Sequence, residues 1–122
     1  MTRPVESANT AAEAIRALGH ATFPRAGGLV FPSDAYDVLS ALAVLAARLP
    51  QTLAQVGGFL DAECEHDRVR VVDGEHAGDP VAAVTTCAVH LETAGNAAHR
   101  LREALDAAAA ALCWAAATDP AP

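Results

Sequence analysis

The sequence predicts an all-α protein, in which a short N-terminal helix precedes an antiparallel hairpin of two long helices. Apolar residues recur at helical spacing over two stretches of more than 30 residues each, around 33–66 and 80–117. Alanine, the strongest helix former, supplies 31 of the 122 residues. Between the two stretches lies an Asp73-Gly74 turn signal. Helices this long cannot bury an apolar stripe alone, so they are expected to pack on each other.

The last stretch, 80–117, is the strongest helix prediction. Asp79 can cap it, and Pro80 suits the first helical position, where its missing N–H costs nothing. Apolar or small residues then alternate at spacings of three and four, which predicts a coiled-coil seam in which Leu101 and Leu105 are fully buried. The predicted seam is Val84, Cys87, Leu91, Ala94, Ala98, Leu101, Leu105, Ala108 and Leu112.

The middle stretch predicts a helix over 33–66, capped by Ser33. Its apolar positions have a mean spacing of about 3.6 residues, typical of a straight helix. Pro50 lies in the middle, so the helix either kinks there or stops near Arg48 and restarts. We favour the kink, because the apolar stripe continues across it. The predicted stripe is Ala35, Val38, Leu42, Leu45, Leu49, Leu53, Val56, Leu60 and Cys64.

The first part of the chain is less regular. Residues 1–9 are expected to be flexible, and Thr10 with Glu13 has the capping-box spacing that begins a short helix over 10–19. Residues 10–122 should form a single helical domain, as expected for this length. The connector 19–32 holds two prolines and three glycines but is apolar. It is expected to fill the core, with a partner-binding loop as the alternative.

Composition argues against several partners. The net charge of −7 opposes direct binding to nucleic acid and to an anionic membrane surface. No uncharged apolar run reaches the roughly 20 residues that span a bilayer. Three cysteines, an odd number, fit reduced thiols in a reducing compartment. These observations favour a cytoplasmic protein.

The best metal candidate combines Cys64 and His66 with Cys87 and His90, which an antiparallel hairpin could bring together. Thiolate and imidazole are ligands that suit zinc, but the usual C-x2-4-C spacing is absent. Cys87 also falls on the predicted seam, where a free thiol behaves as a small apolar residue. We therefore expect two core thiols, two surface imidazoles, and no metal or other cofactor. Phosphate-binding loops, nucleophile elbows and HExxH are also missing, so an enzyme is not expected.

Acidic residues gather around the predicted turn, from Asp61 to Asp79. Those on the helix alternate along the chain and spread over its circumference, and no EF-hand spacing is present. A solvated tip explains them. The alternative function is a small acidic regulatory protein whose tip binds a basic partner, such as a DNA-binding protein.

The apolar surface of the last helix is wider than one partner helix needs, and beyond Ala107 almost no polar side is left. This predicts a non-enzymatic interaction or scaffold protein that self-associates or binds another helical protein. A homodimer forming a helical bundle is the simplest cover. A different protein or the connector 19–32 are the alternatives. The expected interface residues are Trp114, Cys113, Leu105, Leu112 and Phe31.

The segment YDVLSALAVLAARLPQTLAQVGGFLDAE at 36–63, followed by a DG turn and an Ala-rich helix opened by DP, also carries a resemblance. In this pattern the chain resembles small uncharacterised helical proteins of high-GC actinobacteria. The resemblance implies a helical hairpin and no catalytic residue.

Overall fold

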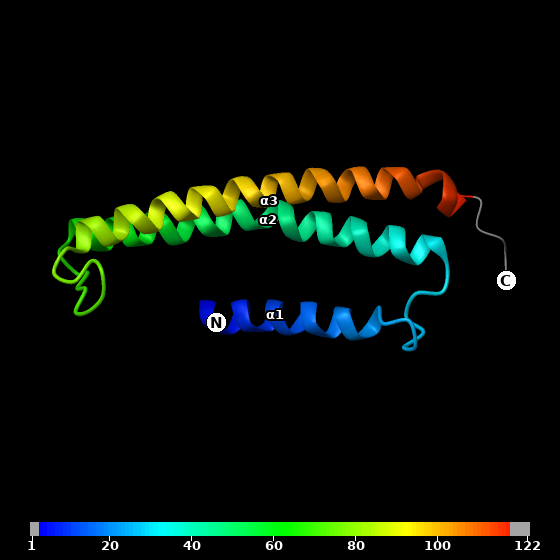
Figure 1. The fold of residues 1–122 in the computed structure, drawn as a ribbon, viewed down its shortest axis with the longest axis horizontal. Helices are drawn as coiled ribbons and strands as arrows, with labels where there is room; N and C mark the ends of the chain where they lie inside the picture. Colours follow the sequence, from blue (N-terminus) through cyan, green and yellow to red (C-terminus); the bar gives the residue numbers. More distant parts are fainter. Residues whose placement is uncertain (1–2, 118–122) are drawn as a thin grey trace. The chain divides into compact units, whose positions relative to one another are not determined.

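The computed structural model describes residues 3–117, with side chains up to Cys113. It contains three helices, α1 (Pro4–Ala21), α2 (Pro32–Glu65) and α3 (Pro80–Ala117), which confirms the predicted all-α fold (Figure 1). The described residues form two compact units. One contains α1, the connector, the first turn of α2 and the end of α3, and the other is Val38–Ala110.

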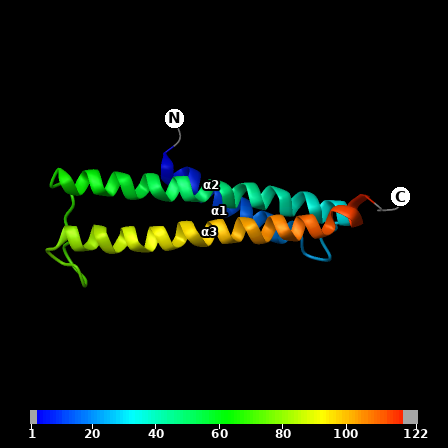
Figure 2. The ribbon, with the colours of Figure 1, turned by 90° about the horizontal axis from the view of Figure 1, so that it is seen from above.

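The second unit is the predicted hairpin. Within it α2 and α3 run antiparallel and side by side, joined by the loop 66–79 (Figures 1 and 2). Helix α2 is continuous across Pro50, so the alternative of a stop near Arg48 and a restart is wrong. The bounds of α3 are those predicted, and Asp79 caps it by accepting a 3.1 Å hydrogen bond from the backbone N–H of Ala82.

The two ends of α2 are fixed by specific hydrogen bonds. The helix begins at Pro32, a favoured first position, rather than after a Ser33 cap. The carboxylate of Asp34 accepts the backbone N–H groups of Val30 and Phe31 at 2.8 and 2.9 Å. The hydrogen bond from Phe31 and then that from Val30 lower the pKa of Asp34, because both stabilise its ionised form.

The far end of α2 closes with a Schellman motif. The N–H of Arg68 donates to the carbonyl of Glu63 at 2.9 Å, and that of Asp67 donates to the carbonyl of Cys64 at 3.1 Å. Asp67 takes the left-handed conformation, with φ 55°, a position that usually favours glycine. The Arg68 guanidinium also holds both carboxylate oxygens of Glu63, at 2.7 and 3.0 Å.

Helix α1 is longer than predicted. It starts at Pro4 rather than Thr10, because proline suits the first turn and Arg3 is already extended ahead of it. It passes through Gly19 and ends at Ala21, where the backbone N–H and the hydroxyl of Thr22 both donate to the carbonyl of Leu18. None of its residues is buried.

The connector between α1 and α2 does not fill a core as expected. Phe23 and Val30 are 66% and 67% exposed, and Phe31 is half-buried. A tight turn explains one of its glycines. Any side chain at Gly28 would collide with the backbone carbonyl of Ala21.

The core of the hairpin is made of small residues. Of the five buried residues in the described chain, four are alanines: Ala43, Ala46, Ala98 and Ala109, with Val84 as the fifth. Among the side chains that the structure describes, no large one is fully buried. This corrects both predicted stripes, because four of the leucines and valines placed in them are exposed.

On α3, the residues that face α2 agree with every second position of the predicted seam. The positions between these are shifted by one residue toward the C-terminus. Val84 and Ala98 are buried and Leu91 and Leu105 are half-buried, as the predicted seam requires. Between them, however, Gly95 and Ala109 take the places given to Ala94 and Ala108. Leu101, predicted to be fully buried, is 47% exposed. That prediction is wrong, because the position after Leu101 is the one that lies toward α2.

On α2, several of the residues that face α3 are likewise one position after the predicted stripe. The residues that face α3 occupy positions spaced alternately four and three residues apart, a heptad seam rather than the predicted straight 3.6 stripe. Leu45, Leu49 and Val56 lie one residue before it and are 37%, 37% and 47% exposed. The seam consists of Leu39, Ala43, Ala46, Pro50, Leu53, Gly57, Leu60 and Cys64, each buried or half-buried.

Candidate interaction surface

One close contact sets the register of the two long helices. A Cβ atom at Gly57 would lie 3.4 Å from Cδ1 of Leu91, at van der Waals contact, so these two positions face each other across the seam. In an antiparallel pair, each step forward on one helix is a step back on the other. Counting out from this contact pairs a large residue with a small one along most of the seam: Leu39 with Ala109, Leu105 with Ala43, Leu53 with Gly95, and Leu60 with Ala88.

This arrangement decides which side chains stay outside. Small residues let the two backbones approach closely, so the seam has little space for further bulk. The larger apolar residues of α2 therefore flank the seam instead of filling it. The hairpin has two broad faces, one on each side of the seam.

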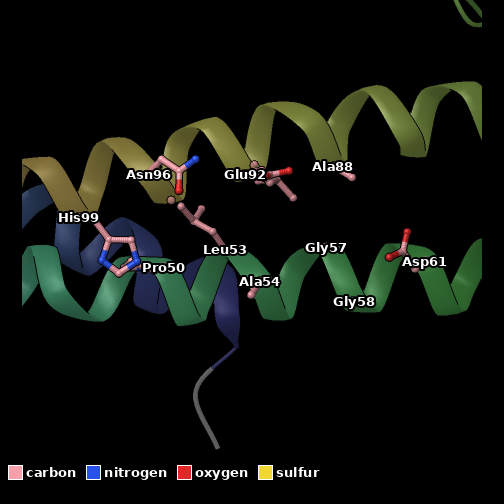
Figure 3. Close-up of a pocket in the computed structure, with 12 residues that line it drawn as sticks. Pro50, Leu53, Ala54, Gly57, Gly58, Asp61, Ala88, Glu92, Asn96 and His99 are labelled. Carbon is pink, nitrogen blue, oxygen red and sulfur yellow. The ribbon is translucent and has the colours of Figure 1, made fainter.

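One face is polar. A shallow groove of about 450 Å³ runs along it, with Gly57 and Gly58 on one side and Asp61, Glu92, Asn96 and His99 at its rim (Figure 3). Each of these rim residues directly follows a seam position on its own helix. Residues one step after the seam therefore share this face on both helices.

Residues one step before the seam must share the opposite face. On α2 they are large and apolar, and on α3 they are mostly small. We call this surface the apolar face and define it by six of its apolar members: Leu42, Leu45, Leu49, Val56 and Phe59 of α2, and Leu101 of α3. Phe59 is 62% exposed and Leu42 is half-buried.

The apolar face has a periodicity of its own. Positions 38, 42, 45, 49, 52, 56 and 59 are spaced alternately four and three residues apart, which is a second heptad seam on α2. Only Thr52 is polar among them, and its hydroxyl donates to the carbonyl of Arg48. Between Val38 and Phe59 the single charged residue is Arg48, which lies outside this seam. The hairpin accordingly carries two coiled-coil seams and fills one.

None of the five predicted interface residues is among the six that define the apolar face. Leu105 is half-buried in the seam with α2, where it is opposite Ala43, so it is part of the hairpin interior. Leu112 and Phe31 are half-buried, and Cys113 is exposed. The side chain of Trp114 lies outside the described residues. The five α2 residues of the apolar face could have been found from sequence as a second four-three repeat on α2, one residue ahead of the first.

The predicted metal candidates are not brought together. Cys64 is in the seam beside Val84, whereas Cys87 lies one residue before the seam of α3, toward the apolar face. His66 and His90 are both exposed. Within the part of the chain that the structure describes, no three histidine, cysteine, aspartate or glutamate side chains come close enough to hold a metal ion.

The loop end of the hairpin is acidic. Residues 61–79, here called the tip, contain seven of the fifteen acidic residues and only two arginines, Arg68 and Arg70. The hydrogen bond from Arg68 is the main cause that lowers the pKa of Glu63. The remaining acidic side chains of the tip are exposed. Outside the tip, the charges of the hairpin between 38 and 110 are balanced, three arginines against three acids.

Helix α2 also has the length and composition to cross a membrane, the one such helix found among the described residues. The expectation from sequence rested on uncharged apolar runs alone, none of which is long enough to span a bilayer. Helix α2 is long and apolar enough when its single arginine, Arg48, is allowed within the run. Core helices of soluble proteins satisfy it too.

No family model matches the chain, and no curated protein or solved structure is significantly similar to it. The structure itself defines the class: a three-helix, all-α protein whose two long helices form a hairpin with a large exposed apolar surface.

Proposed function

We propose that this protein is a non-enzymatic helical interaction protein whose apolar face binds an α-helix or helical hairpin of another protein chain. The observation that supports this most strongly is the second heptad seam on α2, with Leu45, Leu49 and Phe59 exposed along it. Soluble monomers rarely expose contiguous apolar surface of more than about 300–600 Å², and larger patches usually mark interaction sites. A repeat with heptad spacing fits a helical partner in particular.

The chemistry of the face indicates the type of partner. It lacks charged groups along α2 between Val38 and Phe59, so affinity would come from burying Leu, Val and Phe side chains. Leu49 and Phe59 are the expected anchors. Leu49 lies near the centre of the face, where large side chains dominate binding, and Phe59 is the aromatic residue of the face. Salt should affect such binding little, because screening weakens charge pairs and leaves apolar burial intact.

Two valines of α2 provide a matched test. Val56 is on the apolar face and 47% exposed, whereas Val44 is on the opposite side and 50% exposed. We would tag the full-length protein and its Val56→Glu and Val44→Glu variants and compare the proteins each retains from its host. The proposal expects binding, to a copy of itself or another helical protein, that survives about 0.5 M salt. It should be lost with Val56→Glu and kept with Val44→Glu.

Two results would contradict the proposal. The first is equal retention of every bound protein by the two valine variants. The second is flotation of the wild type with neutral phosphatidylcholine vesicles, abolished by Val56→Glu, because that would assign the face to lipid. A soluble, cytoplasmic location is part of the proposal and is supported by the net charge of −7 and the three free cysteines.

The acidic tip supports a second candidate function, docking of a basic partner. Its net charge of −5, from seven acids and two arginines, accounts for most of the −7 of the chain. Binding of this type would be lost by about 0.5 M salt, because exposed charge pairs are screened. It would also be unaffected by Val56→Glu. The same retention experiment therefore separates the two candidates.

A further inference from the structure

We propose that the occupant of the apolar face is a second copy of this chain, with α2 packed antiparallel on α2 of the partner copy. This inference rests on the proposed function and names its partner. It also fixes the orientation, with the two acidic tips at opposite ends of the dimer.

The area of the face suits a second hairpin. From Val38 to Phe59 the face is about 32 Å long, and two adjacent helices are about 20 Å wide. Its footprint is therefore about 600 Å², and side chains that interdigitate bury more accessible surface than the footprint alone. Stable interfaces bury about 800 Å² per partner. A single short helix would cover about half of this width, whereas another hairpin covers all of it.

The second seam of α2 is suited to pairing with itself. A heptad seam has two kinds of position, those that follow a four-residue step and those that follow a three-residue step. In an antiparallel pair, a position of one kind faces a position of the other kind, as in the contact between α2 and α3. If α2 pairs with a copy of itself in that way, Leu42 faces Phe59 of the partner subunit. Leu45 likewise faces Val56 of the partner subunit. Leu49 faces Thr52 of the partner subunit. Four of the five large α2 residues of the face therefore have a large apolar neighbour, and the twofold axis passes between positions 50 and 51.

Charge fixes the orientation. A parallel dimer would place two tips of net charge −5 side by side, whereas an antiparallel dimer keeps them apart. The tip begins at position 61, about 16 Å from the axis at 1.5 Å per residue, so the two tips are more than about 30 Å apart. That separation exceeds the Debye length of about 8–10 Å at physiological salt. The balanced charges of the hairpin body add no net repulsion at the contact.

Sedimentation equilibrium on the full-length protein tests the inference at micromolar concentration. The wild type should have twice the 12.5 kDa mass of the chain. Val56→Glu should raise the dissociation constant by about 100-fold or more, since it places a carboxylate in an apolar interface. Val44→Glu, with nearly equal exposure on the polar side, should change it by less than about threefold. Circular dichroism checks that both variants keep their helices.

Several outcomes would overturn the inference. A wild-type mass of 12.5 kDa would exclude the dimer and assign the face to α1 or to another protein. If that monomer still loses a bound protein with Val56→Glu, the proposed function survives and only the second copy is excluded. A dimer that is unaffected by Val56→Glu uses a different surface. A dissociation constant that falls more than about tenfold between low and high salt would indicate adjacent tips and a parallel dimer.

Discussion

Exchanging volume across the seam tests the register directly. Ala43 is 5% exposed and lies opposite Leu105, so the structure has no space for a second leucine at that position. Ala43→Leu should cost about 1–3 kcal/mol of the free energy of unfolding, the usual penalty for overpacking. Leu105→Ala removes half-buried methyl groups and should cost about 1–3 kcal/mol. In the double variant the two volumes are exchanged, and the costs should largely cancel.

Urea unfolding followed by circular dichroism at a fixed protein concentration measures all three variants. The cycle should give a favourable coupling of about 1–3 kcal/mol, as found for residues in direct contact. Ala47→Leu is the control, because Ala47 is exposed on the polar face four residues away and should change stability by less than about 0.5 kcal/mol. Additive single effects, or an Ala43→Leu variant as stable as the Ala47→Leu control, would refute the register.

Three further predictions concern the helix ends, the proline and pH. Pro50→Ala should stabilise α2 by about 1–3 kcal/mol in thermal unfolding, because an interior proline is unfavourable. Pro80→Ala, at a favoured first helical position, is the control. A lower melting temperature for Pro50→Ala would count against the prediction. Asp67→Gly should add about 0.5–1 kcal/mol by relieving the φ of 55°. Asp61→Gly inside the helix should instead remove about 0.3–0.5 kcal/mol, because glycine is the poorer helix former of the two, and equal signs would contradict the motif. The lowered pKa of Asp34 means that its stabilisation is present above the ordinary value of 3.8 and is lost as pH falls through the lower folded pKa. The melting temperatures of the wild type and Asp34→Asn should therefore differ at neutral pH and converge as pH falls below the folded pKa of Asp34, and a gap independent of pH would exclude this role.

Local signals in the sequence predicted the hairpin well. Asp79 and Pro80 fixed the start of α3, and the apolar repeat carried α2 through Pro50. The start of α1 was misplaced because Thr10 and Glu13 have capping-box spacing inside a helix that Pro4 already begins. Capping signals indicate where a helix could start, and an earlier start leaves them unused.

The candidate site was harder to predict. The predicted seams were placed on the largest apolar residues, which was wrong for Leu45, Leu49 and Leu101. These three were expected to be buried and are partly exposed. Alanine is compatible with either side of a helix, so in a chain with 31 alanines the size of a residue does not reveal its burial. The decisive feature is the close approach at Gly57, a tertiary contact. Its effect on the neighbouring leucines depends on the register of the two helices, which the sequence alone does not give.

The central claim is that large apolar residues flank a seam of small ones and are covered by another chain. Hydroxyl-radical footprinting of Phe59, which is 62% exposed in the single chain, tests it most directly. Modification of Phe59 should be several-fold slower in the wild type and in Val44→Glu than in Leu101→Glu, where the face can no longer be covered. Equal modification of Phe59 in all three proteins would contradict the account.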